Sequence, residues 1–171
     1  FGYIASIREA KPDWRADQGP VVVLGAGGAA RAVLVSLIDE GAKEIRLLNR
    51  TGARAEELAR EFGGPIKTYP WSARHEVLDG AAMLINTTSQ GMVGQPEQDL
   101  VLDRLPTSAL VSDIVYIPLE TTLLAAARKR GNTTVNGLGM LLHQARPAFK
   151  AWFGVMPEVT KDLRSMIEAT I

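Results

Sequence analysis

The sequence has 171 residues, of which 46% are hydrophobic and 22% are charged, which is the composition of a soluble globular domain. This length predicts about one domain. Nineteen basic and nineteen acidic side chains give a formal net charge of zero, which argues against duplex nucleic acid or an anionic membrane surface as a partner.

Cysteine is absent, and His75 and His143 are the only histidines. The absence of cysteine excludes a disulfide scaffold, a cysteine zinc site and a thiolate nucleophile, and it is compatible with a cytoplasmic protein. Two histidines are too few to favour a histidine metal centre, so we expect no bound metal. No apolar run approaches the roughly 20 residues of a transmembrane helix, so we expect no membrane span.

The first residues predict a helix. Ile4, Ile7 and Ala10 recur at helical spacing, and Pro12 closes the segment. The chain starts at Phe1, without an initiator methionine or a signal-peptide pattern, so it begins on a half-exposed amphipathic helix. This start suggests that a preceding piece has been removed, and a processed or tagged terminus is the alternative.

Short apolar runs alternate with amphipathic stretches from Pro20 onward. The apolar runs predict strands at residues 21–24, 44–48, 66–69, 81–85, 109–115 and 133–135. Apolar residues at helical spacing predict helices at 30–38, 55–62, 123–127, 138–152 and 159–167. Pro147 is expected to kink the fourth of these helices. Strands separated by helices predict an α/β fold with a doubly wound, mostly parallel sheet.

A glycine-rich motif follows the first predicted strand. Gly25, Gly27 and Ala30 occupy the three small positions of a G-x-G-x-x-A pattern. In a dinucleotide-binding fold the first position permits a tight turn, the second lets the backbone approach the pyrophosphate, and the third lets the helix pack on the sheet. A strand precedes the motif and a helix follows it, so we predict a cofactor site here in preference to a structural turn.

No acidic residue follows the second strand, where an NAD site usually places one against the ribose 2′-hydroxyl. Asn49 stands there instead and can bond a hydroxyl without repelling a phosphate. Arg50 and Arg54 add positive charge, and Thr51 supplies a hydroxyl at an expected helix N-terminus. These residues favour a 2′-phosphate, and therefore NADP over NAD.

Two alternatives stay open at these loops. Arg50 and Arg54 could be solvated surface residues that pair with Glu57 or Glu61. Residues 85–92, an apolar run followed by small polar residues, could line the ligand crevice or form an ordinary turn, and the residues alone favour the turn.

The motifs together resemble the cofactor domain of the shikimate dehydrogenase family over essentially the whole chain. The matching segments are residues 25–29, 49–51 with Arg54, 86–89, 113–116 with Pro118, 122–124 and 136–145. The last segment is much more specific than the glycine loop. The resemblance implies a two-domain enzyme that reversibly reduces 3-dehydroshikimate to shikimate with NADPH in aromatic amino-acid biosynthesis.

The resemblance also implies a role for each matching position. The implied cofactor-binding residues are Gly25, Ala26, Gly27, Gly28 and Ala29 at the pyrophosphate, Asn49, Arg50, Thr51 and Arg54 at the 2′-phosphate, Thr87 and Ser89 in the third loop, and Ile114 and Gly137 near the nicotinamide. Tyr116 and Gln144 would reach the polar groups of the substrate. Alternatively, Tyr116 is a half-buried packing residue and Gln144 faces solvent. His143 is expected to be a surface or satisfied histidine and not an acid catalyst.

The chain departs from the family pattern at two places. The family's catalytic Lys and Asp belong to an N-terminal substrate domain, and residues 1–3 resemble the segment directly after that Asp. Both catalytic residues are therefore expected to be missing, and no catalytic residue is assigned here. Asn136 stands where the family more commonly has Asp.

The implied organisation has three parts. Residues 1–18 form a linking helix from a missing substrate domain, 19–153 form a Rossmann-like NADP-binding domain, and 154–171 form a helix that packs toward the missing domain. The fragment is expected to bind NADP(H) without turning over substrate, and a homodimer is considered for the intact enzyme.

Three alternative functions remain. A quinate/shikimate dehydrogenase relative shares the fold and the loops. A glutamyl-tRNA reductase domain is compatible with residues 20–54 alone. A non-catalytic NADP-binding module would instead use the amphipathic helices at both ends of the chain to bind a partner.

Overall fold

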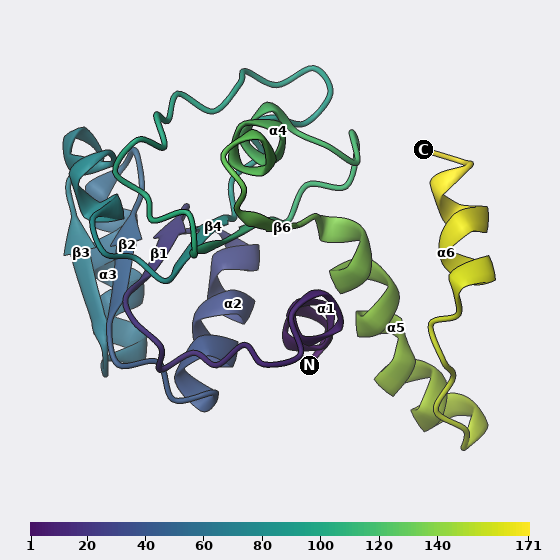
Figure 1. The fold of residues 1–171 in the computed structure, drawn as a ribbon. Helices are drawn as coiled ribbons and strands as arrows, with labels where there is room; N and C mark the ends of the chain where they lie inside the picture. Colours follow the sequence, from purple (N-terminus) through teal and green to yellow (C-terminus); the bar gives the residue numbers. More distant parts are fainter.

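Six parallel strands form the centre of the computed structural model, which describes residues 1–171 (Figure 1). The strands are β1 (Val21–Leu24), β2 (Ile45–Leu48), β3 (Ile66–Tyr69), β4 (Met83–Asn86), β5 (Leu110–Asp113) and β6 (Thr133–Val135). They are arranged in the order β3-β2-β1-β4-β5-β6, and every neighbouring pair is parallel. The order reverses between β1 and β4, which is where a doubly wound sheet opens a crevice beyond its carboxyl ends. The predicted fold class is confirmed.

Helices alternate with most of these strands, as the sequence pattern predicted, although the segment between β4 and β5 contains none. They are α1 (Gly2–Ala10), α2 (Gly28–Asp39), α3 (Gly52–Phe62), α4 (Thr122–Lys129), α5 (Gly137–Phe153) and α6 (Lys161–Glu168), with short 3₁₀ helices η1 (Trp71–Ala73) and η2 (Glu76–Leu78). α2 begins at Gly28, before the apolar periodicity that starts at Ala30, because its first residues carry no large apolar side chain. α3 begins at Gly52, directly after Thr51, which was expected at a helix N-terminus. The strand predicted over 109–115 ends at Asp113. α5 continues through Pro147 to Phe153.

Apolar side chains fill both faces of the sheet. Val21 and Val23 of β1 belong to a cluster that includes α1, α2 and α3, whereas Val22 and Leu24 belong to a second cluster that includes α4. Figure 1 shows α1 and α2 on one side of the sheet and α4 on the other. A strand buried on both faces reads as a continuous apolar run, which is why β1 was evident in the sequence.

The first helix is more deeply buried than its half-exposed amphipathic pattern predicted. α1 lies between α2 and α5, and its Tyr3, Ile4 and Ile7 are part of the core (Figure 1). Two glycines permit this close packing: a Cβ on Gly2 would lie 2.7 Å from the Gln144 backbone nitrogen, and one on Gly139 would collide with the Ser6 side chain. Within this chain, α1 therefore packs as part of the core that covers one face of the sheet.

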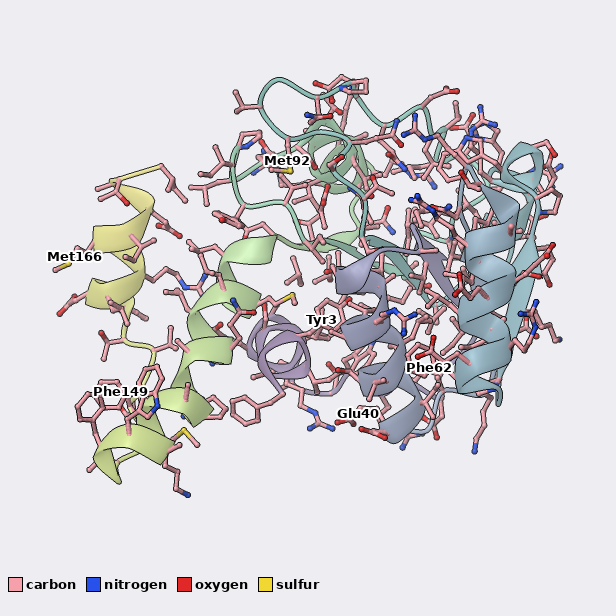
Figure 2. All side chains as sticks on the ribbon, turned by 180° about the vertical axis from the view of Figure 1, so that it is seen from behind. Tyr3, Glu40, Phe62, Met92, Phe149 and Met166 are labelled. Atoms are coloured by element: carbon pink, nitrogen blue, oxygen red, sulfur yellow. The ribbon has the colours of Figure 1, made fainter.

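The last part of the chain extends away from the sheet. α6 has no buried residue, and the second half of α5 exposes Phe149, Trp152 and Phe153. Figure 2 shows Phe149 and Met166 on this outlying part of the molecule. Arg164 of α6 donates to Glu9 Oε2 at 2.7 Å, which ties α6 to α1. None of the helices combines the length and the apolar character needed to cross a bilayer.

Candidate functional site

A cavity of about 250 Å³ lies at the carboxyl ends of β1, β2, β3 and β4. Its lining residues come from the loops that follow those strands: Gly25, Ala26, Gly27, Asn49, Arg50, Arg54, Trp71, Thr87, Thr88, Ser89 and Gln90. Segments that are far apart in the sequence therefore meet here. Most of the residues predicted to bind the pyrophosphate and the 2′-phosphate are among them, as are Thr87 and Ser89.

The glycine turn after β1 has the geometry that its motif predicted. Gly25 has a φ of 106°, and a Cβ there would lie 2.7 Å from Thr87 Oγ1, so no other residue fits without strain. Thr87 Oγ1 in turn donates to the Leu24 carbonyl at 2.7 Å. This contact joins the loop after β4 to the end of β1.

The start of α2 faces open space. No heavy atom lies within 4 Å of the position a Cβ would take on Gly27 or Gly28. Gly27 is the N-cap of α2 and brings no side-chain capping bond, so the first N–H groups of the helix are free to meet a ligand. A helix N-terminus of this kind favours an anion such as a pyrophosphate. The residues present therefore fit a dinucleotide.

The two arginines on the β2 side are free of acidic partners. Arg50 and Arg54 are exposed and take part in none of the ion pairs of the structure. Glu61 instead pairs with Arg31 of α2 at 2.5 Å, and this contact holds the pKa of Glu61 below its ordinary value. The surface ion pairs considered as the alternative for Arg50 and Arg54 are therefore absent, and both guanidinium groups are available to a phosphate.

The polar residues beside the arginines also lie at this edge. Asn49 donates to the Thr51 carbonyl at 2.9 Å, which orients its carboxamide, and Asn49 itself lines the cavity. Thr51 is the N-cap of α3, as predicted, but its side chain makes no capping bond. The N-terminal amides of α3 therefore keep their capacity to bind an anion.

Asn86 and Asp113, two buried polar residues, are the last residues of β4 and β5. Asp113 accepts hydrogen bonds from Asn86 Nδ2 at 3.0 Å, from the Val115 backbone at 3.0 Å and from Thr121 Oγ1 at 2.8 Å. Burial raises the pKa of Asp113, and the three donors act against that increase. The carboxylate is thus held beside the crevice without opening into it.

Ile114 and Gly137, both predicted to lie near the nicotinamide, are close to each other, and neither lines the 250 Å³ cavity. The Gly137 N–H donates to the Val115 carbonyl at 2.9 Å, and a Cβ on Gly137 would collide with the Ile114 carbonyl oxygen. Asn136 caps α5 by accepting from the Leu138 N–H at 3.2 Å, and its amide donates to the Leu119 carbonyl at 3.1 Å. An Asp would retain the first contact and lose the second, which gives a physical reason for Asn at this position.

Tyr116 and Gln144 lie outside the 250 Å³ cavity. Tyr116 is 36% exposed in the loop after β5, and Gln144 is exposed on α5, where it lines a separate cavity of about 240 Å³ with Phe1 and Met140. Gly28, Ala29 and Thr51 adjoin the first cavity in sequence without lining it. His143 is buried with its Nε2 3.2 Å from Glu9 Oε2, so it is a satisfied histidine, as expected.

Sequence reasoning missed Trp71, Thr88 and Gln90 of the cavity lining. Trp71 follows β3 directly after Pro70, and the Arg74 guanidinium lies 5.8 Å from its ring centroid. Its place just past a strand end was a usable signal, because loops after parallel strands line the crevice. Thr88 and Gln90 lie within the segment for which an ordinary turn was the alternative.

Comparison with known proteins places the chain in a family. The model for shikimate / quinate 5-dehydrogenase matches residues 8–114, and the model for the shikimate 5′-dehydrogenase C-terminal domain matches residues 137–166. A curated shikimate dehydrogenase (NADP(+)) of Rhodospirillum rubrum is 56% identical over 98% of this chain and 60% of its own length. The chain thus spans about 60% of the length of the curated relatives it matches.

Two solved structures show the same architecture. The Corynebacterium glutamicum quinate dehydrogenase, in complex with NAD, has a TM-score of 0.87 and 29% identity, over 98% of this chain and 60% of that one. The Thermus thermophilus shikimate 5-dehydrogenase, in complex with NADP(H) and shikimate, has a TM-score of 0.79 and 33% identity, over 98% and 59%. The chain therefore belongs to the shikimate / quinate 5-dehydrogenase family.

Proposed function

We propose that this chain is the NADP-binding part of a shikimate dehydrogenase, which reversibly reduces 3-dehydroshikimate to shikimate. One observation carries the proposal: a single cavity joins the open glycine turn after β1 to two arginines that have no acidic partner. The name of the Rhodospirillum rubrum relative, which specifies NADP(+), supports it.

The dinucleotide would cross the carboxyl edge of the sheet. The backbone from Gly25 to Ala29 would bind the pyrophosphate at the N-terminus of α2. Asn49, Arg50, Thr51 and Arg54 would bind the 2′-phosphate, where guanidinium groups give charge-assisted hydrogen bonds. Thr87 and Ser89 would contact the cofactor from the loop after β4.

The strand order supports an orientation in which the adenosine half of NADP lies on the β2 and β3 side of the glycine turn and the nicotinamide half lies on the β4 and β5 side. Moving outward from β1 to β3, the strand ends present the glycine turn, then the arginines, then Trp71. A 2′-phosphate is attached to the same ribose as the adenine, so the base would lie next to Arg50, where Trp71 offers the only aromatic ring of the lining. In the other direction, Ile114 and Gly137 would lie near the nicotinamide.

When bound, the reduced nicotinamide would supply the hydride that is added to the ketone carbon of the substrate ring, and the oxidised form would accept it in the reverse reaction. The residues of this chain would bind and orient the cofactor, which is the usual contribution of a protein to cofactor chemistry. Tyr116 and Gln144 would bind polar groups of the substrate. No residue of this chain is assigned the proton transfer, which belongs to the Lys and Asp of the family's substrate domain.

The proposal includes a second domain. α6 and the second half of α5 would pack against the part of the relatives that this chain does not span, because Phe149, Trp152 and Phe153 leave an apolar surface there. α1 would then link the two domains while remaining packed on α5. The proposal places the intact enzyme in the cytoplasm. Size-exclusion chromatography of the full-length enzyme tests whether it forms a homodimer.

Quinate dehydrogenation is the second candidate, because the TM-score of 0.87 belongs to a quinate dehydrogenase. That protein was solved with NAD, whereas the β2 edge here carries Arg50 and Arg54 and no acid. Activity of the full-length enzyme with shikimate and with quinate separates the two substrates.

Tryptophan fluorescence tests whether NADP occupies the cavity. Trp71 lines it, whereas Trp14 is buried in the core and Trp152 is exposed on α5. We expect NADP to quench the emission of the wild-type chain and of the Trp152→Phe control, but not that of Trp71→Phe. Equal quenching in both variants would contradict the proposed site. Shikimate-dependent NADPH formation by the chain alone would contradict its role as the non-catalytic part.

A further inference from the structure

Asn86 and Asp113 face each other at the ends of two neighbouring strands. They are register partners in the parallel pair β4–β5, and their side chains are 0% and 1% exposed. Asn86 Nδ2 donates to Asp113 Oδ1 at 3.0 Å. This pair lies between the loop after β4, which lines the nucleotide cavity, and the loop after β5, which carries Ile114 and Tyr116.

Asn86 holds the loop after β4. Its Oδ1 accepts from the Thr88 N–H at 3.0 Å and from Thr88 Oγ1 at 2.7 Å, and its Nδ2 also donates to the Gln90 carbonyl at 3.2 Å. Both donors and both acceptors of the carboxamide are therefore used. Thr88 and Gln90 line the cavity, so the orientation of Asn86 determines the shape of one cavity wall.

Asp113 holds the loop after β5. Oδ1 accepts from the Val115 N–H at 3.0 Å, and Oδ2 accepts from Thr121 Oγ1 at 2.8 Å. Thr121 is the N-cap of α4 and accepts from the Leu124 N–H at 3.3 Å. One carboxylate therefore connects β4, the loop after β5 and the start of α4.

All three contacts of Asp113 are hydrogen-bond donors in this arrangement. An Asn would have to turn its amide group toward Thr121 Oγ1, the one contact that can also accept, and it would replace two charge-assisted contacts with neutral ones. Burial raises the pKa of Asp113, which means that the charged form opposes folding. The buried carboxylate contacts residues on both crevice loops, and this geometry points to a role in positioning them.

We propose that Asp113 is a positioning residue that fixes the loops after β4 and β5 relative to each other and so sets where the nicotinamide half of NADP lies. The proposal rests on the NADP site proposed above. Asp113 does not touch the cofactor: it acts through Asn86 on Thr88 and Gln90, and through the Val115 backbone on the neighbouring Ile114.

Binding measurements with two ligands distinguish a positioning role of Asp113 from a role in folding alone. NADP would use both halves of the site, whereas adenosine 2′,5′-bisphosphate carries the 2′-phosphate half and no nicotinamide. The binding of both to the 171-residue chain is measured by calorimetry, and thermal unfolding is followed in parallel. The variants are Asp113→Asn and Asp113→Ala. Ser112→Ala is the matched control, because Ser112 is equally buried on the same strand but lies beside Tyr3, away from the crevice loops.

We expect Asp113→Asn to weaken NADP binding about tenfold, to change the affinity for adenosine 2′,5′-bisphosphate less than twofold, and to retain the thermal transition of the wild type. Asp113→Ala should weaken NADP binding more than Asp113→Asn does, again with little change in the affinity for adenosine 2′,5′-bisphosphate. Ser112→Ala should change neither affinity. Parallel loss of both affinities, or loss of neither, would overturn the positioning role. A wild-type chain that binds neither ligand would instead overturn the proposed NADP site itself.

Discussion

Single residues decide what the crevice can accept. Gly25 needs its positive φ and lacks room for a Cβ, whereas Gly27 has an ordinary φ of −95° and open space beside it. Both glycines belong to one motif, which predicted a tight turn at the first and a close approach of a ligand at the second. The positive φ of Gly25 fits the predicted turn, and the open space beside Gly27 leaves room for the proposed pyrophosphate.

Substitution of the two glycines tests this distinction. We expect Gly25→Ala to destabilise the chain by about 1–3 kcal/mol, because it adds backbone strain and a collision with Thr87. Gly27→Ala should leave stability within about 1 kcal/mol but abolish NADP binding, because its methyl group fills the space of the pyrophosphate. Urea unfolding and a binding titration provide both readouts. Equal stability losses in the two variants would contradict the distinction.

The pKa of Asp113 predicts a pH dependence. Its pKa is raised in the folded state above the ordinary value of 3.8, so the folded protein binds this proton more tightly than the unfolded chain. The charged form therefore costs stability at pH 7, and that cost is lost as the pH falls through the folded pKa. We expect wild type to gain stability relative to Asp113→Asn between pH 7 and pH 4, measured by urea unfolding. A constant difference across that range would contradict the raised pKa.

At the scale of elements, local patterns predicted the parts, and pairing between distant segments decided their arrangement. The apolar run at 21–24 and the spacing along 30–38 are local signals, so β1 and α2 were predicted. The order of the strands depends on pairing between segments far apart in the sequence, which no local pattern contains. For the same reason the contact between Asn86 and Asp113, separated by 27 residues, could not be foreseen.

α5 shows how one residue joins two elements. Asn136 caps the helix and also donates to the Leu119 carbonyl in the loop before α4. We expect Asn136→Asp to keep the cap and cost about 1 kcal/mol through the lost donor, and Asn136→Ala to cost about 2 kcal/mol. Chemical denaturation measures both values. A variant with Asp as stable as wild type would show that the contact with Leu119 contributes nothing.

At the scale of the whole molecule, the core and the C-terminal part differ in burial. The sheet is covered on both faces, whereas Phe149, Trp152 and Phe153 are exposed in the second half of α5. Figure 2 shows Phe149 on this outlying part of the molecule. Helical spacing of apolar residues predicted the helix but not this exposure, since the spacing does not identify what the apolar side meets. In the proposed two-domain enzyme, this surface would pack against the part of the relatives that the chain does not span.

Polar substitution tests the role of this surface. The double variant Trp152→Gln with Phe153→Gln should bind less of a dye that reports exposed apolar surface and should self-associate less, because a large apolar patch promotes both. Its affinity for NADP should be unchanged, since neither residue lines the cavity. Unchanged dye binding would show that these side chains do not form the exposed patch.

Arg50 and Arg54 have no acidic partners, and we propose that they make the cavity a site for a 2′-phosphate. Titration calorimetry of NADP and NAD, on the wild-type chain and on Arg50→Ala, tests this proposal. We expect NADP to bind more tightly than NAD, and Arg50→Ala to lose roughly 1.5–3 kcal/mol of that preference, as for one charge-assisted contact. Equal affinity for the two nucleotides, or a preference that survives Arg50→Ala unchanged, would contradict it.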